Sequence, residues 1–138
     1  MQDVKAILKS YIPALRYCEK CFRELDAARD VSVRSPKMDG MPRTSSPHGL
    51  DLQVAKTDAI QRRAEKERER VLQVREEIEI MIESLEDYEQ RFVIKQRYIY
   101  GESWESIANE ANMSKRTVYY VHGRALNELR RTYENHNH

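Results

Sequence analysis

Apolar residues recur from Val4 onward in alternating steps of four and three. The set is Val4, Leu8, Tyr11, Leu15, Cys18, Phe22 and Leu25. Such spacing places every member on one stripe of a helix, so it predicts a helix from about residue 3 to about residue 30 with a coiled-coil seam. Pro13 interrupts the run and has no amide hydrogen to donate. We therefore expect a kink there, or a helix that begins near Ile12.

A second seam with the same steps occurs later in the chain. Its members are Ile60, Ala64, Glu67, Val71, Val74, Ile78, Met81 and Leu85. They predict a second long helix over about residues 51–84, separated from the first by a loop at 31–49 that holds three prolines and two glycines. Because each stripe needs a partner surface, residues 1–84 are expected to form a long antiparallel, coiled-coil-like helical hairpin, or to self-associate through the same seam. The loop is interpreted as a solvated hinge, with contact to a partner as the alternative.

A third apolar segment, EDYEQRFVIKQRYIYG, predicts a helix from about Leu85 to Tyr100 that stops at Gly101. Its apolar surface is expected to be the packing base for the helices after Gly101. The residues that supply this surface are Tyr88, Phe92, Val93, Ile94, Tyr98 and Ile99.

Residues 103–131 have the pattern of two helices joined by a tight turn. Ser103 can cap a helix over Trp104–Ala111, Asn112 suits a left-handed turn, and Ser114 can cap the next helix. The apolar slots fit this register and are occupied by Ile107, Ala108, Met113, Val118, Val121, Ala125 and Leu129. The pattern predicts an all-α protein in which residues 85–132 form a trihelical helix-turn-helix domain, with a flexible tail at 133–138.

Charge is distributed unevenly along a chain whose formal net charge is only +1. Residues 114–131 carry five basic side chains against one acidic one, whereas 85–112 carry six acidic against three basic. A basic second helix is typical of a helix that lies in the major groove of DNA. Lys115, Arg116 and Tyr119 or Tyr120 are therefore candidates for base contacts, Ser114 and Thr117 for phosphate contacts, and Arg124 for the backbone. Arg130 and Arg131 would add charge along the same helix, and His122 is expected near the DNA side as a phosphate neighbour or spectator.

The segment RFVIKQRYIYGESWESIANEANMSKRTVYYVHGRALNELRR resembles the fourth conserved region of primary-type bacterial sigma factors. The matching features are VIKQRY, GESWESIA, NMSKRTV at the turn and GRALNELR at the end. With SVRSPKMDGMPRTSS between two long helices, the whole chain is similar to small phage and prophage proteins of the RinA and ArpU type, which regulate late genes. The resemblance implies double-stranded DNA as a partner and RNA polymerase as a candidate partner. The chain departs from the sigma-factor pattern in having two tyrosines, Tyr119 and Tyr120, where sigma factors usually have polar or basic residues.

Other chemistries find little support in the pattern. Cys18 and Cys21 form a Cys-x-x-Cys pair without a second pair or suitably spaced histidines, so we interpret them as buried apolar residues rather than as a redox or zinc site. The sequence shows no glycine-rich phosphate loop and no nucleophile with an evident base, so we expect no enzyme, metal or cofactor. No signal peptide or membrane span is evident, and a cytoplasmic location is expected.

The combined pattern predicts a sequence-specific DNA-binding transcriptional regulator, an activator of phage or prophage genes, with the hairpin as a homodimer or polymerase contact. Two alternatives remain open. One is a DNA-packaging subunit of the small terminase kind, which also joins a helix-turn-helix to oligomerising helices. The other is a structural coiled-coil protein whose basic helix binds nothing in particular.

Overall fold

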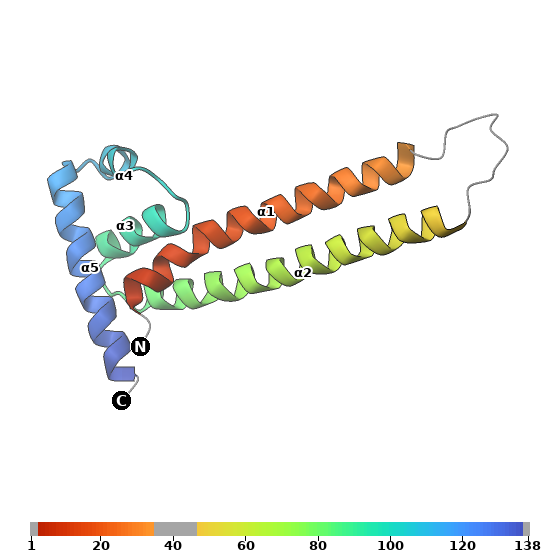
Figure 1. The fold of residues 1–138 in the computed structure, drawn as a ribbon. Coiled ribbons are helices and arrows are strands. Elements are labelled where there is room, and N and C mark those ends of the chain that lie inside the picture. The colour runs from red at the N-terminus through yellow and green to blue at the C-terminus, as the bar shows by residue number, and fades with distance from the viewer. Residues whose placement is uncertain (1–2, 35–46, 137–138) are drawn as a thin grey trace. The chain divides into compact units, whose positions relative to one another are not determined.

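The computed structural model describes residues 3–34 and 47–136, and in these two ranges the chain forms five helices and no strand (Figure 1). The predicted all-α class is confirmed. The helices are α1 (Val4–Arg34), α2 (Pro47–Glu83), α3 (Tyr88–Tyr98), α4 (Trp104–Ala111) and α5 (Lys115–His136). Over the same ranges, none of the helices has both the length and the apolar character needed to cross a membrane.

The chain divides into two compact units that do not coincide with the predicted division at residue 84. Unit 1 contains Met1–Pro13 and Leu72–His138, and unit 2 contains Ala14–Val71. Contacts inside unit 1 explain why the two chain segments belong together. The Tyr11 hydroxyl lies 3.4 Å from Arg75 Nη1, and Arg130 forms an ion pair with Asp3 at 3.6 Å.

Unit 2 consists of the later part of α1 and the earlier part of α2, which lie side by side and run in opposite directions (Figure 1). The Arg68 guanidinium lies over the Phe22 ring at 6.0 Å, and Arg29 Nη2 donates to Gln61 Oε1 at 3.3 Å. Cys18 and Cys21 are both free and buried, in line with the interpretation of this pair as apolar packing residues. Burial raises the pKa of the Cys18 thiol, which disfavours the reactive thiolate.

Both predicted seams are confirmed at the level of burial, because every seam residue is buried or half-buried. The helix bounds differ from the prediction. α1 is one helix from Val4, so a start near Ile12 is wrong; Pro13 is exposed, and the loss of one hydrogen bond there does not end the helix. Residues 31–34 and 47–49, expected in the loop, are helical, since proline is tolerated in the first turn of a helix and Pro47 begins α2. The remainder of that predicted loop, 35–46, lies outside the described residues.

Helices α3, α4 and α5 of unit 1 pack around one apolar cluster. Its buried members are Val93, Ile107, Ala108, Val118 and Val121, and Phe92, Trp104 and Met113 pack against them. Every apolar slot predicted for the last two helices is buried or half-buried, which confirms the predicted register of α4 and α5. Ala108 of α4 packs in the same cluster as Val118 and Val121 of α5.

Helix α3 is shorter than predicted. It begins after Asp87, whose carboxylate accepts from the Glu89 amide at 2.9 Å, so Tyr88 lies in the first turn. Tyr88 is 71% exposed, and the prediction that it belongs to the packing surface is wrong. The helix ends at Tyr98 with Ile99 as its C-cap, so the predicted stop at Gly101 lies too far along the chain. Gly101 instead supplies a left-handed residue after the helix, with φ +68°, and a Cβ there would come within 3.1 Å of Ile12 Cδ1.

The packing of α2 generates a matched test of burial. Ile78 is fully buried, whereas Ile80 on the same helix is 63% exposed. We expect Ile78→Ala to lower the free energy of unfolding by about 2–5 kcal/mol, because the cavity left behind adds to the lost transfer energy. Ile80→Ala is expected to change it by less than about 0.5 kcal/mol. Urea unfolding followed by circular dichroism measures both, and equal effects would contradict this orientation of α2.

Candidate nucleic-acid interface

The turn between α4 and α5 positions the whole candidate surface. The Ser103 hydroxyl accepts from the Ser106 amide at 3.1 Å and so caps the start of α4. Asn112 ends the helix with φ 54° and ψ 44°, and the Met113 amide next to it donates to Ala108 O at 3.0 Å. The left-handed residue reverses the chain within a few residues, as the sequence predicts, and directs the start of α5 out of the core.

The hydroxyl groups of Ser114 and Thr117 cap the start of α5. Ser114 Oγ accepts from the Thr117 amide at 3.2 Å and lies 2.9 Å from Thr117 Oγ1. Both residues are exposed, as a phosphate contact would require. One lone pair of Ser114 is already used in capping, so phosphate at this position would meet the backbone amides of the first turn as well as the hydroxyls.

Four residues spaced along α5 form what we call the basic stripe: Arg116, Tyr120, Arg124 and Arg131. All four are exposed, and their spacing places them on one side of the helix. Within the stripe, Arg124 Nη1 donates to the Tyr120 hydroxyl at 2.9 Å, and the guanidinium lies 5.7 Å from the centre of that ring. Tyr120 thus orients one guanidinium of the stripe at the surface.

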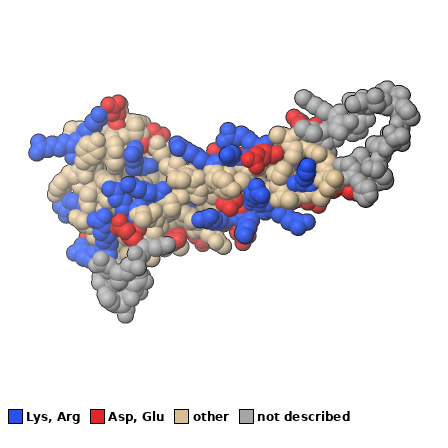
Figure 2. Space-filling view, viewed as in Figure 1, with Lys and Arg blue, Asp and Glu red and all other residues tan. Residues whose placement is uncertain are grey.

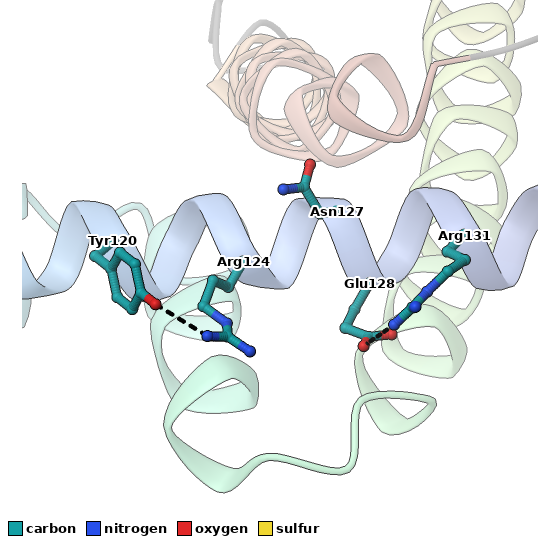
Figure 3. Close-up of a pocket in the computed structure, with 5 residues that line it drawn as sticks. All are labelled: Tyr120, Arg124, Asn127, Glu128 and Arg131. Atoms are coloured by element: carbon teal, nitrogen blue, oxygen red, sulfur yellow. Dashed lines mark hydrogen bonds and ion pairs between the residues drawn. The ribbon is translucent and has the colours of Figure 1, made fainter.

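An open hollow runs beside the carboxyl-terminal part of the stripe (Figure 3). It is lined by Tyr120, Arg124, Asn127, Glu128 and Arg131. Glu128 and Arg131 form an ion pair within this lining. The sequence predicts Arg131 only as added charge and does not predict Asn127 or Glu128, because their place in the hollow depends on how α5 packs on its neighbours.

Lys115 and Tyr119 lie on a different side of α5, against α4. Lys115 Nζ donates to Glu105 Oε1 at 2.7 Å, and the Tyr119 ring lies 5.1 Å from the ring of Trp104. The seven predicted DNA-binding residues therefore form three groups rather than one: the Ser114–Thr117 cap, the basic stripe with Arg116, Tyr120 and Arg124, and the Lys115–Tyr119 pair beside α4.

His122 lies in an aromatic cluster and not on the exposed side. Its Nε2 is 2.7 Å from the Tyr98 hydroxyl, and its ring meets the Trp104 ring edge-on at 4.9 Å. The Arg97 guanidinium lies over the Trp104 ring, 4.4 Å from the ring centre. Burial, together with the nearby charges of Lys5, Arg97 and Arg130, lowers the pKa of His122 to about 4. Its position on α5 turns His122 toward α3 and α4 and away from the side that the basic stripe occupies.

The surface of α5 is cationic but not uniformly so. Figure 2 shows Lys and Arg side chains over the region that α5 occupies in Figure 1, with acidic side chains among them. Arg130, predicted as an added charge on this helix, is half-buried and paired with Asp3. Arg116 forms no ion pair with any residue in the described ranges, so its full charge is available at the start of the stripe.

The chain belongs to a defined family. Residues 50–130 match the family described as "Protein of unknown function (DUF1492)". The match covers most of α2, all of α3 and α4, and three of the four residues of the basic stripe, Arg116, Tyr120 and Arg124. No curated protein and no solved structure matches the chain.

The left-handed turn gives a sharp test of the geometry at Asn112. Asn112→Gly should leave the free energy of unfolding within about 0.5 kcal/mol of the wild type, because glycine adopts positive φ freely. Asn112→Val should lower it by about 1–2 kcal/mol or more, because a β-branched side chain is strained in that region. Thermal unfolding of the two variants distinguishes them, and equal stability would mean that the residue does not adopt the left-handed conformation.

The pKa of His122 predicts a pH dependence of stability. In the unfolded chain a histidine titrates near 6.5, so between pH 6.5 and about 4 the unfolded state binds a proton that the folded state does not. The free energy of unfolding should therefore fall as the pH drops through this window, by about 1 kcal/mol once solvent screening of the half-buried ring is allowed for. Urea unfolding at pH 7 and pH 5 measures the loss.

The variant His122→Gln is the control, since it cannot take up the proton and should lose less stability over the same pH interval. An NMR titration of the His122 ring with a midpoint near 6.5 would contradict the assignment.

Proposed function

We propose that this protein is a transcriptional regulator that binds double-stranded DNA through α4 and α5, used as a helix-turn-helix resembling region 4 of sigma factors. The observation that supports it best is the basic stripe, which begins directly after a capped left-handed turn. A plain helical hairpin with a solvated basic face has no need for a tight turn that directs the amino end of its basic helix outward. DNA recognition uses that arrangement, because the residues of the first turns reach the base edges.

We assign the residues of the basic stripe to two kinds of contact, one with bases and one with phosphates. Arg116, in the first turn of α5, is the residue best placed for a bidentate contact to guanine in the major groove. Arg124 and Arg131 lie further along, and the distance from Arg116 to Arg131 corresponds to about 22 Å of helix. That length is suited to phosphates at the edge of the groove, with the hollow beside α5 open to one of them. Tyr120 lies between Arg116 and Arg124 in the stripe, and its ring edge can contact a thymine methyl group.

The antiparallel packing of α1 and α2 in unit 2 supports a second role, that of a helical hairpin for self-association or for contact with RNA polymerase. Its outer surface on α1 carries exposed cations at Arg16, Lys20 and Arg23. Together with the resemblance to phage late-gene regulators, this favours a cytoplasmic activator of phage or prophage genes that acts as a homodimer. A ring of many subunits in light scattering would favour a DNA-packaging subunit instead.

The proposed function predicts the effect of removing the stripe. A duplex selected from a random pool, with and without host RNA polymerase, supplies the target. The variant Arg116→Ala/Arg124→Ala should lose at least tenfold in affinity for it, since two charged contacts are each worth about 1–3 kcal/mol. Fluorescence anisotropy at fixed salt concentration measures the change.

The matched control is Arg62→Ala/Lys66→Ala, which removes two exposed cations from α2 and should bind the target within about twofold of the wild type. Circular dichroism confirms that both variants are helical. Equal losses in the two variants would contradict recognition by the stripe, and the absence of any salt-dependent DNA affinity in the wild type would contradict the proposed function.

A further inference from the structure

The ion pair between Glu105 and Lys115 joins the first turn of α4 to the first residue of α5. The two residues are ten positions apart in the chain, and the turn at Asn112 brings Lys115 Nζ within 2.7 Å of Glu105 Oε1. The Lys115 side chain is 50% exposed and that of Glu105 73% exposed, so another macromolecule can reach both groups. The hydrogen bond with its charge partner lowers the pKa of Glu105 and raises that of Lys115, so both remain charged at neutral pH.

The position of the Glu105–Lys115 ion pair is unexpected for a DNA-binding surface. It lies beside the amino end of α5, where the proposed function needs attraction to DNA, yet it brings a carboxylate to that surface. Surface ion pairs contribute little to folding stability, with typical values of about 0–1 kcal/mol. A carboxylate next to DNA phosphate is repelled, and repulsive groups of this kind are a general means of discriminating against wrong partners.

We propose that Glu105 is a specificity-determining residue that holds Lys115 away from DNA phosphates and leaves it free to contact a base. This inference rests on the proposed function. An ammonium group has three N–H donors, and Glu105 takes one of them. A phosphate needs the whole positive charge of Lys115 and must compete with Glu105 for it. A base edge needs only a donor, which Lys115 can supply while the pair remains intact.

The chemistry of the pair also favours one kind of base pair. Lys115 can donate to the acceptors O6 and N7 of guanine, and Glu105 can accept from the N4 amino group of cytosine. Donor and acceptor lie side by side on the protein, as acceptor and donor do on the major-groove edge of a G·C pair. The Glu105–Lys115 ion pair therefore recognises a G·C base pair at the position that the start of α5 faces. Arg116 contacts the adjacent base pair.

The variant Glu105→Gln tests the inference, because it keeps the size of the side chain and removes its charge. Once released, Lys115 should contact one more phosphate. Affinity for an unrelated duplex should rise about three- to tenfold, and the slope of log K against log salt should steepen by about 0.9. Affinity for the selected target should rise less or fall, so the ratio of specific to unspecific binding drops. Selection from a random pool should lose the G·C preference at one position.

Two controls separate the pair from a general effect of charge. Glu110→Gln removes the same charge from the exposed surface of the same helix and should leave the slope unchanged. In a Lys115→Gln background, Glu105→Gln should no longer steepen the slope, because no ammonium group remains to be released. Thermal unfolding of each variant shows whether the fold is intact.

The outcomes are distinguishable. If the wild type binds no duplex, the proposed function fails, and this inference fails with it. If the wild type binds its target and Glu105→Gln leaves both slope and ratio unchanged, the inference alone is overturned. It is also overturned if Glu105→Gln steepens the slope equally in the absence of Lys115, or if Glu110→Gln has the same effect.

Discussion

The left-handed residue at Asn112 is the constraint on which the candidate surface depends. Positive φ costs most side chains about 1–2 kcal/mol, and asparagine adopts it more readily than most. At Asn112, packing on both sides of the turn holds the left-handed conformation. Met113 packs against the core cluster on one side of the turn, and Ile107 and Val118 are fully buried in that cluster from α4 and α5. Because the cluster fixes both helices, the turn determines where Ser114, Lys115 and Arg116 leave the core.

Side chains around α5 lie in three different environments. The basic stripe faces solvent, the Lys115–Tyr119 pair lies against α4, and His122 is enclosed by Tyr98 and Trp104. These environments differ in electrostatics as well as in position. Arg116 and Arg124 of the basic stripe form no ion pair within the described ranges, whereas Arg131 pairs with Glu128. The charge of Lys115 is balanced by Glu105, and His122 is neutral at physiological pH. A single helix can thus carry charge on one side and a neutral aromatic packing surface on another.

Local signals make α4 and its flanking turn predictable. Ser103, Asn112 and Ser114 act within a few residues of their own positions, and the predicted bounds Trp104–Ala111 are those of the structure. The seams are also predictable, because helical periodicity reports which side is buried. The prediction for Tyr88 is wrong because periodicity does not show where a helix begins, and Asp87 places that tyrosine at the edge of the core. The Glu105–Lys115 pair and the position of His122 depend on how α4 and α5 pack, which spacing along the chain does not determine.

Unit 1 is discontinuous, and this has a consequence for how the protein is made. Its first segment includes Val4, Leu8 and Tyr11, which are buried, and Leu72 begins its second. On the ribosome these apolar side chains appear long before the residues that complete their unit, and the intervening chain of unit 2 must be synthesised first. Until the second segment of unit 1 is made, the apolar seam of α1 can pack only against the part of α2 that belongs to unit 2. Unit 2 can therefore form from helices that are adjacent in the sequence before the second segment of unit 1 is made. The surface that we assign to DNA lies in that second segment and is completed after unit 2.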